Sequence, residues 1–239
     1  MALLEVAANS LASALAAQAG GARRVELCAS LDDGGVTPSH ATIVRTREGL
    51  TIPLYVLIRP RAGDFVYTDG ELAVMLDDIA HCRSLGCDGV AVGALTPDGE
   101  VDRDACARFV AAAGGMGVTF HRAFDLVADP AAALETLIDL GVARVLTSGG
   151  MPSAVAGAAG LARLVAQAGA RITVMPGAGI TPGNIAALRQ ATGAREFHAS
   201  ATRRLVSAMR RSPVDALGMG AGETRSDVEL VCALVAAIA

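Results

Sequence analysis

Hydrophobic and polar positions follow a repeating order along this chain. A short apolar run rich in β-branched residues is followed by a loop, and then by a longer stretch in which apolar residues recur every three or four positions. Leu72, Met75 and Ile79, for example, share one face of such a stretch. Short apolar runs are typical of buried β-strands, and the longer period is typical of amphipathic helices. The pattern therefore predicts strand and helix units that alternate from one end to the other.

The units follow one another at spacings of roughly 22–34 residues, and their number, eight, is what a (β/α)₈ barrel requires. We therefore predict an α/β fold, a TIM barrel in which residues 1–239 form a single domain. A long loop, residues 201–225, should precede the last helix. The predicted strands are residues 3–7, 24–28, 54–59, 89–95, a strand that begins at residue 117, 143–147, 172–176 and 196–201.

A doubly wound open sheet is the competing fold. Such a sheet usually has fewer strands, and its dinucleotide-binding form carries the glycine pattern G-x-G-x-x-G. Gly177, Gly179 and Gly183 give G-x-G-x-x-x-G, which is longer by one residue. The sequence therefore favours the barrel and gives no NAD signature.

Capping residues predict where several helices begin. Asp129-Pro130 places an acidic N-cap before a proline in the first helical position. Thr181-Pro182 gives a similar signal for the helix that follows the seventh strand. Ser226-Asp-Val-Glu229 has the spacing of a capping box at the start of the last helix.

Composition narrows the chemistry. The chain has 239 residues, a net charge of −4 and 20 basic residues, all of them arginine. Without lysine it cannot form a Schiff base with a substrate or with pyridoxal phosphate, and it has no lysine P-loop. The negative charge gives no sign of a nucleic-acid partner, and no apolar run reaches the length of a membrane span.

The cysteines indicate a reducing environment. They occupy positions 28, 82, 87, 106 and 232, an odd number without paired spacing, and the first residues lack the basic region of a signal peptide. We therefore expect a soluble cytoplasmic protein with reduced thiols. His81, Cys82 and Cys87 are interpreted as helix packing rather than as a metal site.

Polar side chains gather where the predicted strands end. Residues two apart share one face of a strand, so Glu26 and Cys28 form one row and His121 ends another. Because parallel barrel strands end at one rim, we expect these rows to converge there. The catalytic candidates are Glu5, Glu26, His121 and Asp125, with His121 as general acid or base and a glutamate as its counterpart.

Arginines follow two of the strands. A guanidinium group can bind a carboxylate or a phosphate through two hydrogen bonds, so Arg59, Arg61 and Arg122 are expected to clamp an anionic substrate. Glu5 is an isolated charge in an apolar strand, and Arg59 and Arg61 are its expected partners.

Small residues fill the loops after the last three strands. The last two loops of a TIM barrel commonly bind phosphate through backbone N–H groups, although tight turns alone would explain the glycines equally well. The substrate-binding candidates are Arg59, Arg61, Asp64, Arg122, Ser148, Gly149, Gly177, Gly179, His198 and Ser200.

The same residue types allow a metal site. A mixed oxygen and nitrogen site for a divalent ion would use Glu5, Glu26, His121 and His198. Cys28 adds a thiolate, the kind of ligand that copper(I) prefers. Three arginines at one site would repel a cation, which favours the anion-binding interpretation on physical grounds alone.

Several ordered segments carry a family resemblance: Arg24-Val-Glu-Leu-Cys28, Gly34-Gly-Val-Thr-Pro38, Ile58-Arg-Pro-Arg61, residues 119–125, Arg144-Val-Leu-Thr-Ser-Gly149 and Gly177-Ala-Gly179. With them the chain resembles the CutC family of copper homeostasis proteins over almost its whole length, and less so after residue 201. The resemblance implies a barrel, a cytoplasmic location, a homo-oligomer and copper binding or tolerance. Cys28 matches a family cysteine. Where relatives often carry another, this chain has Val6-Ala7-Ala8, which removes a nearby second thiolate.

Three functions follow from these patterns. The first, which the resemblance implies and which we adopt, is a copper homeostasis protein that binds a copper ion, with Cys28 as the candidate ligand. The second is an enzyme of the isomerase or lyase type that acts on a small anionic or phosphorylated substrate through a His/Glu acid–base pair and an arginine clamp. The third is a sugar isomerase or hydrolase that uses a divalent metal.

Overall fold

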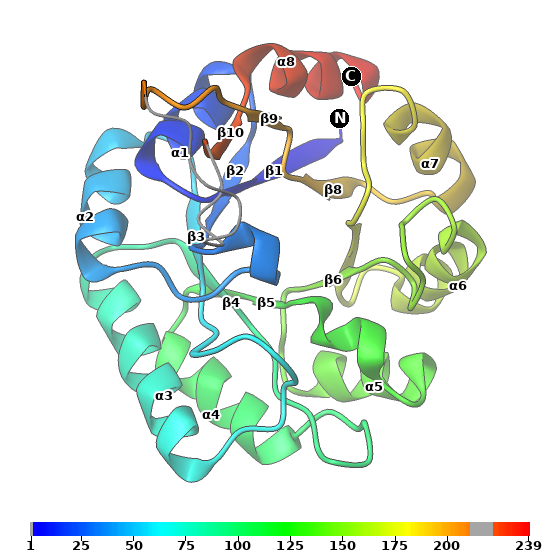
Figure 1. The fold of residues 1–239 in the computed structure, drawn as a ribbon. Helices are drawn as coiled ribbons and strands as arrows, with labels where there is room; N and C mark the ends of the chain where they lie inside the picture. Colours follow the sequence, from blue (N-terminus) through cyan, green and yellow to red (C-terminus); the bar gives the residue numbers. More distant parts are fainter. Residues whose placement is uncertain (1, 211–221) are drawn as a thin grey trace.

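A computed structural model of the chain describes residues 2–210 and 222–239. It confirms the predicted (β/α)₈ barrel, in which helices surround a ring of parallel strands (Figure 1). The strands lie in the order β7-β6-β5-β4-β3-β2-β1-β8, and β7 contacts β8, so the sheet curls round almost to closure. The barrel strands are β1 (Leu3–Ala8), β2 (Arg24–Leu27), β3 (Leu54–Leu57), β4 (Gly89–Val92), β5 (Gly117–Phe120), β6 (Arg144–Thr147), β7 (Thr173–Pro176) and β8 (Glu196–Ala199).

The helices begin at side-chain caps in most cases. Asp129 caps its helix as predicted, because its carboxylate accepts hydrogen bonds from the backbone N–H groups of Ala131 and Ala132. Within the described residues, no helix combines the length and the hydropathy needed to cross a membrane. The helices are α1 (Leu11–Ala19), α2 (His40–Gly49), α3 (Asp69–Ser84), α4 (Arg103–Ala113), α5 (Pro130–Asp139), α6 (Ala158–Ala168), α7 (Ile185–Thr192) and α8 (Val228–Ala237).

Two predicted helix starts are wrong. Thr181-Pro182 forms a turn ahead of α7, whose N-cap is Asn184; the side chain of Asn184 accepts from the N–H of Thr181. The last helix is capped by Asp227, which accepts from the N–H of Leu230. Ser226 is instead buried, and its hydroxyl donates to backbone carbonyl groups that include that of Ser200.

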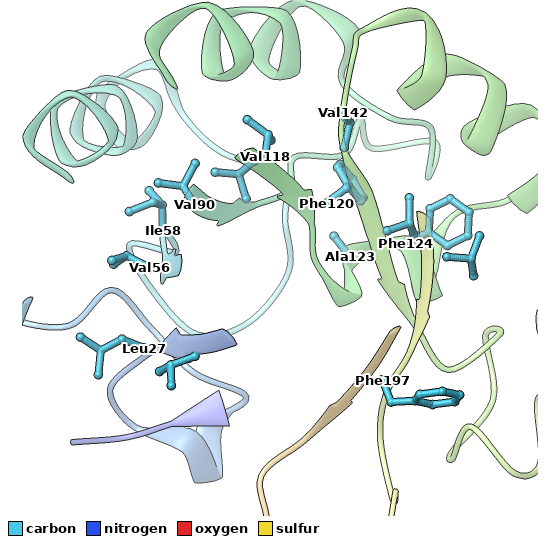
Figure 2. Packing of buried hydrophobic residues seen from close by; sticks show 14 of the residues in the cluster. Leu27, Val56, Ile58, Val90, Val118, Phe120, Ala123, Phe124, Val142 and Phe197 are labelled. Atoms are coloured by element: carbon cyan, nitrogen blue, oxygen red, sulfur yellow. The ribbon is translucent and has the colours of Figure 1, made fainter. Parts of the chain in front are cut away.

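Alternation along the strands separates two environments. Outward-facing residues form the main hydrophobic core between strands and helices, and Figure 2 shows Val56, Val90 and Val118 directed toward the helices from three neighbouring strands. Inward-facing Cys28 and Leu57 belong to a second, small apolar cluster inside the barrel. The remaining inward-facing positions carry most of the charged residues discussed below.

The predicted strands 54–59, 89–95 and 196–201 extend too far. The strand ladders end at Leu57, Val92 and Ala199. Apolar residues such as Ile58 and Leu95 still pack in the core after the chain has left the sheet, so the apolar pattern outlasts the hydrogen-bonded strand.

The predicted long loop before the last helix contains two short strands. β9 (Thr202–Arg204) pairs antiparallel with β10 (Thr224–Ser226), and β10 contacts α1 and β1. The two ends of the loop therefore form a ribbon that is attached to the barrel. Residues 211–221 of the predicted loop lie outside the described residues.

Two glycines make room for Tyr55 inside the barrel. A Cβ atom at Gly89 would overlap the Tyr55 ring, and one at Gly117 would overlap its hydroxyl group. We expect Gly89→Ala to lower the free energy of unfolding by about 1–3 kcal/mol, because the extra methyl group forces a well-packed interior apart. Urea denaturation measures this change.

Gly70→Ala is the matched control. A Cβ at Gly70 in α3 would contact nothing within 4 Å. Its free energy of unfolding should stay the same or rise by up to about 1 kcal/mol, since alanine is the better helix former. Equal destabilisation in both variants would contradict the packing argument.

Candidate functional site

A cavity of about 670 Å³ opens at the C-terminal ends of the barrel strands. Apolar residues such as Leu57, Phe65 and Leu146 form part of its wall. Many of the sequence-predicted candidates meet there: Glu26, Cys28, Arg59, His121, Arg122, Asp125, Gly179, His198 and Ser200. The candidates Glu5, Arg61, Asp64, Ser148, Gly149 and Gly177 are not among the described residues that line it.

Two glutamates and a histidine form the centre of the site. Potential ligand atoms of Glu5, Glu26 and His198 lie within 4.8 Å of one another, and the Nδ1 atom of His198 is 2.7 Å from Glu5 Oε1. Strand register explains this closeness, because Glu5 lies opposite His198 in the β1–β8 pairing and Ala7 lies opposite Glu26 in the β1–β2 pairing. His121, the fourth ligand expected for a divalent ion, is not part of this group.

Glu5 has partners other than those predicted. It lies opposite Arg24 in the sheet, and Arg24 Nε donates a hydrogen bond to its carboxylate. The predicted pairing with Arg59 and Arg61 is therefore wrong. Arg59 and Arg61 follow the C-terminal end of β3, whereas Arg24 is the first residue of β2, at the N-terminal end of the barrel strands.

Burial and neighbouring charges shift the pKa values of Glu5, His198 and Glu26. Burial would raise the pKa of Glu5, but Arg24 and then His198 outweigh it and hold that pKa at about 2. Burial lowers the pKa of His198, but the carboxylates of Glu26 and Glu5 outweigh it and raise that pKa. Burial raises the pKa of Glu26 to about 7. Glu26 is thus a carboxyl group suited to exchanging protons near neutral pH, and the imidazole of His198 lies beside it.

A charged layer lies beneath these residues. Arg24 donates to Glu196 at 2.6 Å, Arg144 donates to the same carboxylate at 3.1 Å, and Arg144 also donates to the Tyr55 hydroxyl at 2.9 Å. Both guanidinium groups lie 5.1 Å from the centre of the Tyr55 ring. Arg24 and Arg144 were not among the candidates predicted from the sequence. Their strand periodicity could have found Arg24, since it precedes Glu26 by two residues on the same face.

His121 lies in the cavity wall in a neutral state. Its Nδ1 atom accepts from the N–H of Ala123 at 3.2 Å, so Nε2 carries the hydrogen of the neutral ring. Nε2 is buried and has no hydrogen-bond partner among the described residues. Burial, and then Arg59, lower the pKa of His121 to about 3. His121 is therefore a hydrogen-bond donor near neutral pH, and His198 is the histidine that lies beside Glu5 and Glu26.

The arginines of the predicted clamp do not meet at one point. Arg59 lines the cavity, but its guanidinium donates to the carbonyl oxygens of Asp33, Gly35 and Gly63 at 2.8–3.0 Å. It therefore holds two loops together, one after β2 and one after β3. The guanidinium carbon of Arg59 also lies over the Phe65 ring, 5.0 Å from its centre.

Arg61 and Asp64 support α3 instead of the cavity. Arg61 donates to Glu71 at 2.5 Å and to Asp64 at 3.1 Å. Glu71 forms the capping box of α3 with Thr68, so the pair with Arg61 anchors the loop to the start of that helix.

Arg122 stays at the rim beside Asp125. Its Nε atom donates to Asp125 at 2.8 Å, and its guanidinium reaches the Ser148 hydroxyl at 3.3 Å. The second oxygen of Asp125 accepts from Thr147, from the N–H of Ser148 and from the N–H of Gly150. Asp125 thus fixes the loop after β6, and Ser148 is fully buried within that loop.

The loops after β7 and β8 form the opposite wall. Ala178 and Gly179 have positive φ angles of 74° and 70°, which shape a tight turn against the cavity. Gly177 is needed for packing, because a Cβ there would overlap Leu146. Ser200 lines the cavity where β8 leads into β9.

Cys28 faces the same cavity as Glu26. Burial, and then the Glu26 carboxylate, raise the pKa of the Cys28 thiol to about 12, so the free side chain is a neutral thiol. A metal ion bound there would have to displace the proton. The residues whose potential ligand atoms lie together are Glu5, Glu26 and His198; Cys28 lines the same cavity but lies outside this group.

Fold and site together define a TIM-barrel protein whose cavity lies where such barrels place their functional groups. The CutC family model matches residues 2–203, and the chain belongs to the CutC family. The match ends close to residue 201, after which the sequence resemblance weakens.

Named relatives agree with this assignment. A CutC family protein of Xanthomonas campestris pv. campestris is 56% identical over 233 residues, which are 97% of this chain and 97% of the relative. A human protein named as a copper homeostasis protein CutC homologue is 49% identical over 199 residues, which are 83% of this chain and 73% of the relative.

Solved structures agree on the fold. The crystal structure of CutC from Streptococcus agalactiae, a protein named for copper homeostasis, has a TM-score of 0.80 and 33% identity, and covers 84% of this chain and 99% of its own. Phosphoribosylanthranilate isomerase from Thermotoga maritima has a TM-score of 0.59 at 11% identity, covering 100% of this chain and 98% of its own, and shares the fold alone.

The raised pKa of Glu26 predicts a pH effect on stability. Because its pKa rises from 4.5 to about 7 on folding, Glu26 contributes stability that is fully present below pH 4.5 and is lost as the pH rises through 7. Between about pH 5 and pH 8, the wild type should lose about 2–3 kcal/mol of unfolding free energy relative to Glu26→Gln. Urea denaturation at both pH values measures this, and parallel pH profiles would contradict it.

Proposed function

We propose that this chain serves copper homeostasis by binding a copper ion at the rim of the barrel. The observation that carries the proposal is the contact between Glu5 and His198 Nδ1 at 2.7 Å. A carboxylate behind one ring nitrogen orients a histidine and leaves its other nitrogen available as a ligand, as is usual in metal sites. His198 lines the cavity, so its Nε2 is that remaining atom.

Two further donors belong to the same strand face. Glu26 has a potential ligand oxygen in the group with Glu5 and His198, and Cys28 follows Glu26 by two residues and lines the same cavity. Nitrogen, oxygen and sulfur donors together suit copper, which binds such sites more strongly than other divalent first-row metals do.

The positions of the arginines support this proposal. Repulsion from three arginines was the physical objection to a cation at the rim. Arg61 lies outside the cavity, and Arg122 is paired with Asp125, so two of the three charges are removed or offset. Arg59 lines the cavity and donates to backbone carbonyl oxygens, so its charge is still present there. Arg24 donates to two carboxylates, those of Glu5 and Glu196, so its charge is offset where it lies closest to His198.

The same proposal includes a cytoplasmic location and a homo-oligomer. The five cysteines are all free thiols, as expected in a reducing compartment. The homo-oligomer is carried over from the family resemblance.

Copper affinity tests the proposal. Cys28→Ser and His198→Gln should each weaken copper binding by more than about tenfold, since even loss of an outer-shell partner has effects of that size. Competition with a copper chelator measures the affinity. Cys106→Ser, a buried cysteine on α4, is the matched control and should bind like the wild type. Unchanged affinity in both rim variants would reject the rim site.

A second candidate function is supported by the cavity itself. Its volume of about 670 Å³ is far more than one ion needs, and small-molecule sites occupy about 300–1,000 Å³. Glu26, with its pKa raised to about 7, lies beside His198 at its base, and Arg122 lies at its rim. Proton transfer on a small anionic or phosphorylated substrate, by an isomerase or lyase, is the reaction type that these groups support.

Thermal shift with metal-stripped protein tests the second candidate. A panel of phosphorylated sugars and small carboxylates should contain a ligand that raises the melting temperature, since binding to the folded state stabilises it. The shift should disappear in Arg122→Gln and persist in Arg61→Gln, because Arg61 lies outside the cavity. Loss of the shift in both variants, or in neither, would reject Arg122 as the anion-binding group.

A further inference from the structure

Cys82 and Cys87 lie together at the C-terminal turn of α3, on the outer side of the barrel. The chain ends this helix with Gly86 in the left-handed region, at a φ of 71°. The N–H of Gly86 donates to the carbonyl of Arg83 and that of Cys87 to the carbonyl of Cys82, both at 3.1 Å. These two bonds define a Schellman motif, which brings the side chains at the positions of Cys82 and Cys87 into contact.

The same motif ends two other helices of this barrel. After α1, the N–H of Ala22 donates to Ala17, and after α5 the N–H of Val142 donates to Leu137. Each of these pairs consists of buried apolar residues. At the end of α3 the equivalent pair consists of two thiols. The sequence predicts helix packing for this pair, and the motif supplies that packing while bringing two cysteine side chains together.

The thiols interact with each other and with a nearby positive charge. The contact between the two thiols raises the pKa of Cys82 and lowers the pKa of Cys87. The guanidinium of Arg47, which donates to Asp88 at 2.5 Å, also lowers the pKa of Cys87. Both cysteines are free and buried, with Cys87 5% exposed. Apart from its chain neighbours, no described residue has an atom within 4 Å of a Cβ built at Gly86, so the turn is open on its outer side.

We propose that Cys82 and Cys87 form a second copper site, in which the two sulfur atoms bind one copper(I) ion. Copper(I) is a soft ion that selects thiolate ligands. Binding releases one proton from each thiol and forms two copper–sulfur bonds, with no change of oxidation state. The bound unit carries one negative charge, and Arg47 lies beside it to offset that charge. The site shares no residue with the rim site, so it does not depend on the proposed function of the cavity.

Copper(I) stoichiometry under anaerobic conditions tests this site. The full chain is titrated with copper(I) against a competing copper(I) chelator. Cys82→Ala/Cys87→Ala should bind one copper(I) ion fewer per chain than the wild type. The double variant should remain folded, because the same motif after α1 already carries the alanine pair Ala17 and Ala22. Urea denaturation checks the fold.

Cys28→Ser separates this site from the rim site. It should keep the copper(I) ion of the Cys82–Cys87 pair, and X-ray absorption of that variant should show two sulfur neighbours around copper. If the double variant binds as many copper(I) ions as the wild type, or if copper in Cys28→Ser has no sulfur neighbours, the proposal is overturned. If Cys28→Ser alone leaves the stoichiometry unchanged while the double variant loses one ion, the proposal here stands and the rim site fails.

Discussion

The buried contact of Glu5 with Arg24 and His198 is the interaction on which the rest of the site depends. A carboxylate inside a barrel is costly unless it is paired, and here the sheet register places a guanidinium on one side of it and an imidazole on the other. The pairing holds Glu5 ionised, which in turn raises the pKa of His198. Removing Glu5 would leave Arg24 with Glu196 alone and His198 without its orienting partner.

The charge environment inside the barrel differs on the two sides of Glu5. Below Glu5, Arg24, Arg144 and Glu196 form a compensated charged layer around Tyr55. Above it, Glu26 has no ion pair among the described residues, and burial raises its pKa to about 7. The same unpaired carboxyl group can hold a metal ion beside His198 or move a proton on a substrate, so both proposed functions use one physical feature. The two functions differ in the ligand that the cavity binds. In the first it is a metal ion that displaces protons, and in the second it is an anion held at the rim by Arg122.

The αβ turns show how one local motif supports different chemistry. Three helices end in the same hydrogen-bonded turn, and the contacting pair is alanine, leucine with valine, or cysteine with cysteine. Backbone geometry alone fixes the contact. A packing position therefore becomes a dithiol without any change in the fold around it.

The barrel is predictable from the sequence because the apolar runs report local structure directly, and Asp129 likewise marks the start of its helix. Two other capping signals, Thr181-Pro182 and Ser226, do not mark helix starts. Most of the charged and histidine residues that line the cavity were also predictable, since strand ends of a barrel meet at one rim. Partners across the barrel depend on strand register and loop geometry, which no local pattern contains. For this reason the pairing of Glu5 with Arg24 rather than Arg59, the contact of Arg61 with α3, and the position of His198 rather than His121 beside the glutamates are visible only in the folded barrel.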